Sequence, residues 1–317
     1  MRSAPRTGQG NQVLVWCLYG VLLLICLSLG TFIGLIRSGG LTAQVFTAGL
    51  LHKTPQEVFG RRDLVILLLG TDEDRAPGGK KIDKAAARSD MMMVARLHFK
   101  EKRITGITIP RDTLADLPGY HARRINAYHA IGGPRLAREA VENLLGIKID
   151  RVVVVDYPVF QKMVNMIGGI DIDVAKRLKY TDEAGDLYID FQPGLQHMNG
   201  YQAMCYLRYR KDSDFLRQAR QRAFLVAFKQ QATKKFLSAG AMINEVSDLT
   251  GHAFTDEELA TLLLFGKSVG TSNIKLGMLP VKDALHYDLQ VDMAKLQDSL
   301  KEYELIDDTR VATAQKP

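Results

Sequence analysis

Arginine and aspartate side chains recur in this sequence next to runs that are predicted to be strands, or at the start of a predicted helix. The set comprises Asp72, Arg88, Asp90, Arg111, Arg208, Arg210, Asp214, Arg217 and Gln221. Arg208 and Arg210 are two residues apart in a stretch predicted to be extended, so they share one face. Arg217 and Gln221 are four residues apart and share a face of the following helix. The spacing therefore predicts that several guanidinium groups meet at one place.

Several guanidinium groups at one place require an anion. Their planar forks match phosphate oxygens bidentately, so the natural ligand is a polyphosphate or pyrophosphate group. Two carboxylates, Asp72 and Asp90, beside such an anion would repel it unless a hard cation lay between them. Mg²⁺ typically takes one or two carboxylates together with phosphate oxygens. The chemistry predicted from these residue types is phosphoryl transfer with Mg²⁺ or Mn²⁺.

Simpler explanations exist for single members of the set. A lone Asp214 before a helical run is typical of a helix N-cap. Arg208 and Arg210 could form a solvated strand face, and Arg220 and Arg222 are predicted to be solvated. The prediction of a site therefore depends on the whole set.

Several familiar catalytic templates are absent from the sequence. There is no G-x-S-x-G, no H-E-x-x-H, no C-x-x-C and no phosphate-binding loop of the P-loop type. The seven histidines occur singly, none with metal-ligand spacing, and are predicted to be structural or exposed. These absences disfavour the common hydrolase and kinase classes.

The elements that must position these residues alternate between strands and helices, which predicts an α/β sandwich. Predicted strands are Leu64 to Leu69, Met91 to Phe99, Ile104 to Ile109, Val152 to Val155, Ile170 to Val174 and Ile274 to Leu279. One predicted helix is opened by Gly132-Gly133-Pro134 and closed by Gly146, and another runs from Pro158 to Ile167. A further helix begins at about Gly200, and a long one runs toward Phe236. The last two predicted helices are Asp256 to Lys267 and Val291 to Tyr303. A hairpin is predicted between Tyr180 and Gln196. The apolar faces with Val159, Phe160, Met163 and Val164, and with Phe224 and Phe228, are predicted to be core.

The amino-terminal part of the chain predicts a membrane anchor. The 317 residues carry 42 Lys+Arg against 35 Asp+Glu, with 24% charged and 46% hydrophobic residues and three cysteines, which excludes disorder, collagen-like repeats and a disulfide scaffold. The run Val13 to Ile36 is uncharged and long enough to cross a bilayer, which needs about 20 residues. Arg2 and Arg6 precede it, which places the tail in the cytoplasm and the rest of the chain outside.

The predicted organisation is a cytoplasmic tail at 1–12, a transmembrane helix at 13–36, a juxtamembrane linker at 37–60 with a short helix beginning at Thr54-Pro55, one catalytic domain at 61–306, and a tail at 307–317. Nucleic acid is disfavoured as a partner, because an outside domain would rarely meet it and basic residues do not alternate with aromatic ones. The net positive charge fits anionic lipid or polymer better.

A series of ordered phrases resembles the LytR-CpsA-Psr family of cell-wall glycopolymer ligases. They are Leu67-Leu-Leu-Gly-Thr-Asp72, Arg88-Ser-Asp90, Ile107-Thr-Ile-Pro-Arg-Asp-Thr113, Arg124-Ile-Asn-Ala127, Leu144-Leu-Gly-Ile147, Gly168-Gly-Ile-Asp171, Leu207-Arg-Tyr-Arg210 and Asp214-Phe-Leu-Arg217. The resemblance implies an α/β domain with a mixed central sheet that binds a polyprenyl pyrophosphate carrier and buries its tail in a hydrophobic slot. It also implies transfer of the carrier's glycopolymer, with one phosphate, onto peptidoglycan.

Carried over by position, the resemblance gives each candidate residue a role. It implies that Asp72 and Asp90 are magnesium ligands, that Asp214 and Gln221 are polar partners on the following helix, and that the pyrophosphate-contacting arginines are Arg88, Arg111, Arg208, Arg210 and Arg217. The sequence departs from the family pattern at Leu216, where a glycine is usual, and at Arg222, where a second glutamine is frequent.

The function predicted from the residues and the resemblance together is a membrane-anchored phosphotransferase. In this reaction a sugar hydroxyl attacks the sugar-linked phosphorus and polyprenyl phosphate leaves, with Arg208, Arg210 and Asp214 closest to the chemistry. Two alternatives stay open. One is a hydrolase in which water attacks the same carrier, and the other is a non-catalytic binder of lipid-linked sugar or a membrane-tethered regulator.

Overall fold

The computed structural model describes residues 53–71, 89–182, 187–209, 211, 214–235, 247, 252–284 and 288–306. The side chains of Asp90, Asp182, Leu187, Asp214, Phe215, Arg217 and Gln218 are not described within those ranges. The chain divides between His52 and Lys53, and every described residue belongs to the second unit. The predicted transmembrane run Val13 to Ile36 therefore lies outside the described residues. Among the described helices, none is both long and apolar enough to cross a membrane.

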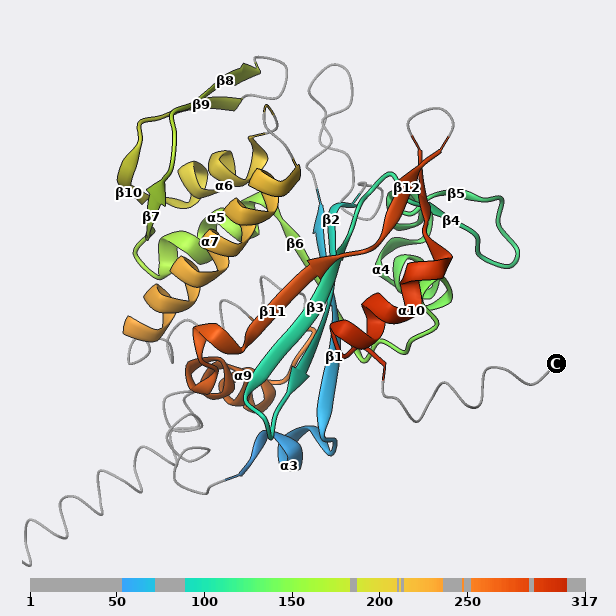
Figure 1. Ribbon diagram of the computed structural model, residues 1–317. Helices are drawn as coiled ribbons and strands as arrows, with labels where there is room; N and C mark the ends of the chain where they lie inside the picture. Colours follow the sequence, from blue (N-terminus) through green and yellow to red (C-terminus); the bar gives the residue numbers. More distant parts are fainter. Residues whose placement is uncertain are drawn as a thin grey trace, which may run out of the picture. The chain divides into compact units, whose positions relative to one another are not determined.

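A five-stranded mixed sheet forms the centre of the described unit, in the order β11-β3-β2-β1-β6 (Figure 1). Its strands are β1 (Asp63–Thr71), β2 (Ser89–His98), β3 (Arg103–Ile109), β6 (Arg151–Asp156) and β11 (Ile274–Met278). β1 pairs antiparallel with β2 and parallel with β6, and β3 pairs antiparallel with β2 and parallel with β11. The predicted α/β class with a mixed central sheet is confirmed.

β1 shows why an apolar run becomes the central strand. Leu67 and Leu69 are fully buried on one face, where they join a core cluster with α4 and α10. Leu64, which is also fully buried, points to the other face and packs with Phe99 and Phe265. A strand covered on both faces needs apolar residues at successive positions rather than at alternate ones, and that is the pattern of this segment.

Helices α4 (Asn126–Leu145) and α10 (Met293–Glu302) supply the core on the first face of the sheet. Gly132 and Gly133 have non-helical backbone angles inside α4, and Pro134 begins the second helical part. The predicted helix after Pro134 is therefore confirmed, including its end at Gly146, but the helical turns from Asn126 were missed. The last predicted helix begins at Met293 rather than Val291, because Val291 ends the short strand β13.

A second layer contains helices α5 (Tyr157–Met166), α6 (Gly200–Arg208) and α7 (Asp214–Lys234) (Figure 1). They enclose a separate core with the antiparallel pair β7 (Ile170–Val174) and β10 (Gly194–Met198). The rings of Phe160, Phe224 and Phe228 follow one another at centroid distances of 5.2 and 5.7 Å. Their prediction as core is confirmed, with Phe224 buried and the other two partly buried.

The third core closes the end of the sheet at which β1 begins. Helix α9 (Asp256–Ser268) packs there with the short helix α3 (Pro55–Phe59), which Thr54 caps as predicted. Phe59 stacks on Phe99 at a centroid distance of 5.3 Å. The helix predicted in the linker therefore packs onto the folded unit.

The remaining described elements are short. They are β4 (Leu114–Ala115) with β5 (Arg123–Arg124), β8 (Leu178–Asp182) with β9 (Leu187–Phe191), β12 (Val281–Asp283) with β13 (Leu289–Val291), and the 3-10 turn Thr271–Asn273. The predicted hairpin between Tyr180 and Gln196 is present as β8 and β9.

Candidate active site

One edge of the central sheet collects the strand ends that carry the candidate residues. β1 ends at Thr71 and β6 at Asp156, and the register pairs these two residues directly. β2 begins at this edge with Ser89, which pairs with Thr71 on its other side. β3 also ends here, since Ile109 pairs with Met92. The topology therefore brings the strand ends next to Asp72, Arg88, Asp90 and Arg111 to a common edge.

A β-bulge lies where β1 and β2 meet at this edge. Gly70 pairs with Met91 and Thr71 pairs with Ser89, so Asp90 is the extra residue between the two pairs. Bulges are frequent next to active sites, where they change the direction of a strand. Asp72 follows Thr71 in sequence but lies outside the described residues, as do Arg88 and the side chain of Asp90.

Arg111 follows β3 in a turn whose backbone is fixed. The Thr113 amide and hydroxyl both donate to the Pro110 carbonyl, and the Asn126 amide donates to the Arg111 carbonyl at 3.4 Å. The Arg111 guanidinium lies 3.5 Å from the carboxylate of Asp112 and is 37% exposed. The side chain is thus held at the edge and is still open to a ligand.

Arg208 is the last residue of α6, and its predicted extended conformation is wrong. The helix continues to Arg208 because Tyr206 and Cys205 bury their side chains in the second core and keep the last turn in place. The Arg208 guanidinium lies over the ring of Tyr157, with 4.6 Å from Cζ to the ring centroid. Tyr157 follows Asp156 directly, so this stacking places Arg208 next to the edge where β6 ends.

Helix α7 carries the remaining candidate residues. The helix begins at Asp214 and includes Arg217 and the half-buried Gln221. The side chains of Asp214 and Arg217 are not described, and Arg210, which precedes the helix, is not described at all. The shared helix for Arg217 and Gln221 is confirmed. The shared face of Arg208 and Arg210 is not described, because Arg210 lies outside the described residues.

Arg220 was predicted to be solvated, and that prediction is wrong. It is 6% exposed and donates hydrogen bonds to the carbonyls of Tyr206 at 3.1 Å and Tyr209 at 2.5 Å. It thereby joins α7 to the end of α6, next to Arg208. Arg222 is exposed, as predicted.

Two supporting residues were missed from the sequence. Tyr157 could have been found, because it stands two residues after the predicted strand Val152 to Val155, and nearness to a strand end singled out other candidates. Arg220 carried no such signal, since a basic residue among other basic residues on a helix is usually solvated.

One face of the sheet near this edge is apolar and only partly buried. The register aligns Val153, Leu68, Met93, Thr108 and Met278 in one row across all five strands. Leu68, Val153 and Met278 are half-buried, and so are Met91 and Val155 in the next row toward the edge. An apolar surface therefore adjoins the strand ends that carry the charged candidates.

Comparison with known proteins identifies the family. The sequence matches the LytR_cpsA_psr family over residues 48–304. The chain belongs to this family. The predicted resemblance is therefore confirmed over residues 48–304.

Among curated relatives, the regulatory protein MsrR of Staphylococcus aureus (strain Mu50) is 30% identical over 226 residues, which is 69% of this chain and 65% of MsrR. The Bacillus subtilis polyisoprenyl-teichoic acid–peptidoglycan teichoic acid transferase TagV is 38% identical over 176 residues, 53% of this chain and 43% of TagV. The chain thus spans less than two thirds of the length of these relatives.

Solved structures share the fold. The crystal structure of B. subtilis TagV matches with a TM-score of 0.61 and 28% identity, covering 77% of this chain and 96% of that one. A structure of TagT bound to LIIa-WTA matches with a TM-score of 0.59 and 27% identity, covering 77% and 91%. Family members therefore include transferases of teichoic acid, and this protein has their α/β architecture.

Proposed function

We propose that this protein transfers a glycopolymer phosphate from a polyprenyl pyrophosphate carrier to a sugar hydroxyl of peptidoglycan. The observation that carries the proposal is the position of Arg208, stacked on Tyr157 at the sheet edge where β1, β3 and β6 end and β2 begins. The 38% identity to TagV, a teichoic acid transferase, supports the same reaction class.

Arg208 and Arg111 would act on the charge of the pyrophosphate. In phosphoryl transfer the protein does little covalent chemistry and mainly positions the groups and stabilises charge. The acceptor hydroxyl would attack the sugar-linked phosphorus, the bond to the bridging oxygen would break, and polyprenyl phosphate would leave. We assign Arg88, Arg210 and Arg217 to the same anion, and Asp214 to the acceptor hydroxyl or to the orientation of Arg217.

We assign a divalent metal to two carboxylates of the sequence, Asp72 and Asp90. The backbone of Asp90 occupies the bulge beside Thr71, and Asp72 follows Thr71 in the sequence. Carboxylate pairs of this kind suit Mg²⁺ or Mn²⁺ with phosphate oxygens. When bound, the metal would neutralise charge on the pyrophosphate.

The apolar surface beside the edge suits the lipid tail of the carrier. Met91 and Leu68 are half-buried there, beside the buried Met93, and methionine side chains adapt to ligands of varied shape. We propose that the polyprenyl chain covers these half-buried residues, while Val13 to Ile36 anchors the protein in the membrane with its amino terminus in the cytoplasm.

A regulatory or binding role is the second candidate, because the relative that matches over 69% of this chain is the regulatory protein MsrR. Such a protein would need the arginines to hold the carrier but would not need the metal site. Metal dependence of turnover therefore separates the two candidates.

The test uses the purified full chain with a synthetic polyprenyl pyrophosphate-linked saccharide, with and without Mg²⁺ and with and without peptidoglycan fragments. Release of polyprenyl phosphate coupled to labelling of the fragments is expected only with Mg²⁺, and Asp90→Asn is expected to abolish it. Asp171→Asn, at an exposed position on β7, is the matched control and should retain activity. Release without labelling would indicate the hydrolase, and tight carrier binding without any release would favour the binder.

A further inference from the structure

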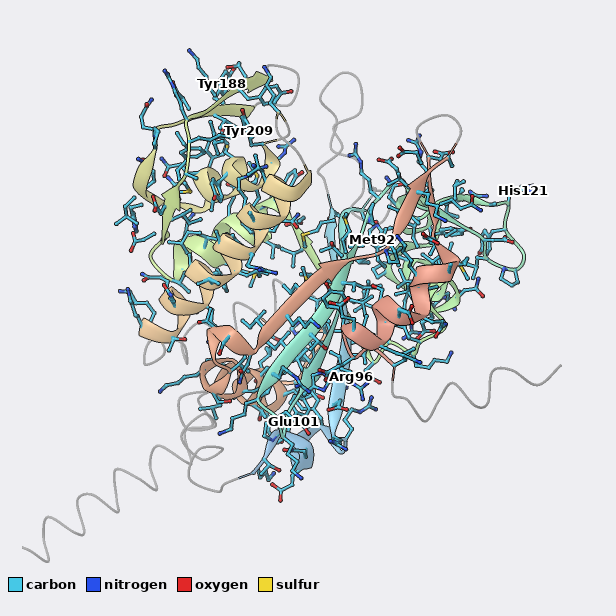
Figure 2. The ribbon with its side chains drawn as sticks, in the orientation of Figure 1. Met92, Arg96, Glu101, His121, Tyr188 and Tyr209 are labelled. Atoms are coloured by element: carbon cyan, nitrogen blue, oxygen red, sulfur yellow. The ribbon has the colours of Figure 1, made fainter. Side chains whose placement is uncertain are left out.

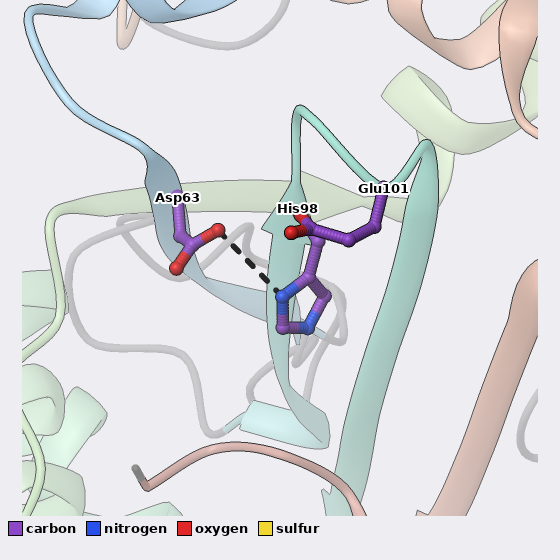
Figure 3. Close-up of side chains that lie close together, drawn as sticks. All are labelled: Asp63, His98 and Glu101. Atoms are coloured by element: carbon purple, nitrogen blue, oxygen red, sulfur yellow. Dashed lines mark ion pairs between the residues drawn. The ribbon is translucent and has the colours of Figure 1, made fainter. Parts of the chain in front are cut away.

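A second cluster of metal-ligand side chains lies at the opposite edge of the central sheet. Asp63 begins β1, His98 ends β2, and Glu101 lies in the turn before β3 (Figure 3). Asp63 and His98 are directly paired across the two strands. Thr71, at the candidate active site, lies eight residues along β1 from Asp63, which corresponds to about 26 Å of strand. In Figure 2, Met92 marks the part of β2 toward the candidate active site, and Arg96 and Glu101 mark the part of the sheet toward this cluster.

Three acceptor atoms face one another in this cluster. One oxygen of Asp63, one ring nitrogen of His98 and one oxygen of Glu101 lie within 4.8 Å of one another. Asp63 Oδ1 and Glu101 Oε2 are buried atoms that accept no hydrogen bond from the described residues. His98 Nδ1 lies 3.6 Å from Asp63 Oδ1, which is too long for a hydrogen bond. A cation between these atoms would give both buried oxygens and the ring nitrogen a partner.

Each of the three side chains is oriented by a second interaction at its other polar atom. Arg96 Nη2 donates to Asp63 Oδ2 at 2.6 Å, and Arg62 Nη2 donates to Glu101 Oε1 at 2.8 Å. His98 Nε2 lies 2.9 Å from the hydroxyl of the fully buried Thr105. Metal sites are typically built in this way, with outer groups that fix the rotamer and tautomer of each ligand.

The state of His98 agrees with a ligand role. If Nε2–H donates to the Thr105 hydroxyl, Nδ1 carries the lone pair that faces the Asp63 carboxylate. The neutral imidazole with a free lone pair is the form of histidine that binds metals. His98 is 5% exposed, whereas the Glu101 side chain is 30% exposed and provides the open side of the cluster.

The donor atoms discriminate between metals. Asp63, Glu101 and Glu304 contribute three negative charges, and Arg62, Arg96 and Arg103 contribute three positive charges, with Arg103 paired to Glu304. These charges balance for every divalent cation alike, whereas Mg²⁺ and Ca²⁺ depend on several oxygen ligands, and the cluster offers two carboxylates and one imidazole. Zn²⁺ gains from an imidazole nitrogen, and a zinc site with three protein ligands completes its tetrahedron with a water molecule.

From these contacts we infer that Asp63, His98 and Glu101 form a zinc site at the edge of the sheet remote from the candidate active site. The bound ion would join the first residue of β1, the last residue of β2 and the turn before β3. It would therefore stabilise the end of the sheet at which the described chain enters the fold.

The test is isothermal titration of Zn²⁺ into the purified full chain in excess Mg²⁺, so that hard oxygen sites are occupied beforehand. We expect one zinc equivalent that is lost in His98→Gln and in Glu101→Gln. Glu101→Gln keeps an oxygen that can accept from Arg62 and lies in a partly exposed turn, so this variant should fold. Its zinc stoichiometry therefore tests the inference even if His98→Gln fails to fold. Thr105→Val should weaken binding about 10- to 100-fold while retaining the stoichiometry.

The matched control is His197→Gln. His197 on β10 and Asp171 on β7 form an exposed pair, with 2.7 Å between His197 Nδ1 and the carboxylate. Among the described residues, the three side chains that could together hold a metal ion do not include either of them. This variant should bind the same zinc equivalent as the parent. The inference is overturned if the parent binds no zinc under these conditions, or if His98→Gln or Glu101→Gln folds and retains the full zinc stoichiometry.

Discussion

The guanidinium of Arg208 stacks on the ring of Tyr157, and this contact joins the end of α6 to the residue that follows β6. A stacked guanidinium keeps its N–H groups at the edge of the plane, where they can still bind phosphate oxygens. The aromatic ring therefore orients the arginine without occupying its donors.

Loss of the Arg208 side chain should lower kcat/KM for transfer much more than loss of the Tyr157 ring. We expect Arg208→Ala to lower kcat/KM by about 10³-fold or more, because a single arginine in phosphoryl transfer can supply that factor. Tyr157→Ala should lower it by about fivefold, the equivalent of a cation–π contact of about 1 kcal/mol. Tyr157→Phe keeps the ring and should stay near the parent value. Single-turnover release of polyprenyl phosphate measures all three, and normal activity of Arg208→Ala would refute the assignment.

Arg220 should be required for stability, although it is one of several basic residues on α7. In Arg220→Met the carbonyls of Tyr206 and Tyr209 would lose a charged donor inside the protein, so we expect a loss of about 3 kcal/mol in the free energy of unfolding. Arg222→Met, two residues along the same helix and exposed, should change it by less than about 0.5 kcal/mol. Urea unfolding of the two variants checks the prediction, and equal midpoints would contradict it.

Gly200 should not tolerate a side chain. A Cβ atom there would lie 2.1 Å from the backbone oxygen of Gln161, so α6 would have to move away from α5. We expect Gly200→Ala to destabilise the protein by about 3 kcal/mol.

Gly266 is the matched comparison for Gly200, because a Cβ atom there meets nothing within 4 Å on α9. Gly266→Ala should stabilise the protein by about 0.5–1 kcal/mol through helix propensity. Thermal unfolding of both variants gives the comparison, and a neutral Gly200→Ala would show that the two helices separate easily.

Cys205 should be unreactive in the native protein. It is 1% exposed, and burial raises the pKa of its thiol, so the thiolate that attacks disulfide reagents is scarce near neutral pH. In a chain with Cys17→Ser and Cys26→Ser, we expect an aromatic disulfide reagent to react only at the rate of unfolding. The rate at which the reagent labels Cys205 should therefore increase strongly with urea concentration and only weakly with pH. Rapid labelling in buffer alone would contradict the burial of Cys205.

The central strands and most helices were predictable from the sequence, because their signals are local. Leu64 to Leu69 is apolar at successive positions, and the structure has it as a strand buried on both faces. Thr54 and Gly146 mark a helix start and a helix end by capping, which depends on neighbouring residues alone. The turns of α4 before Gly132 were missed, because two glycines and a proline indicate a break rather than a continuation.

It was predictable that the strand ends beside Asp72, Arg88 and Arg111 meet, since strand ends in an α/β sheet gather at a common edge. The bulge at Asp90 was not predictable, because it depends on how β1 and β2 align. The helical position of Arg208 and the burial of Arg220 also depend on contacts between α6 and α7. Such contacts leave no periodic pattern in the sequence.

The sequence by itself determined the α/β class, the family and the residue types available for phosphoryl transfer. Only the tertiary structure decided that Asp63, His98 and Glu101 meet, and that Tyr157 supports Arg208. The physical reason is that helix and strand periodicity is encoded over a few neighbouring residues. The pairing register and the packing of helices instead join residues that are far apart in the chain, and these determine which side chains meet.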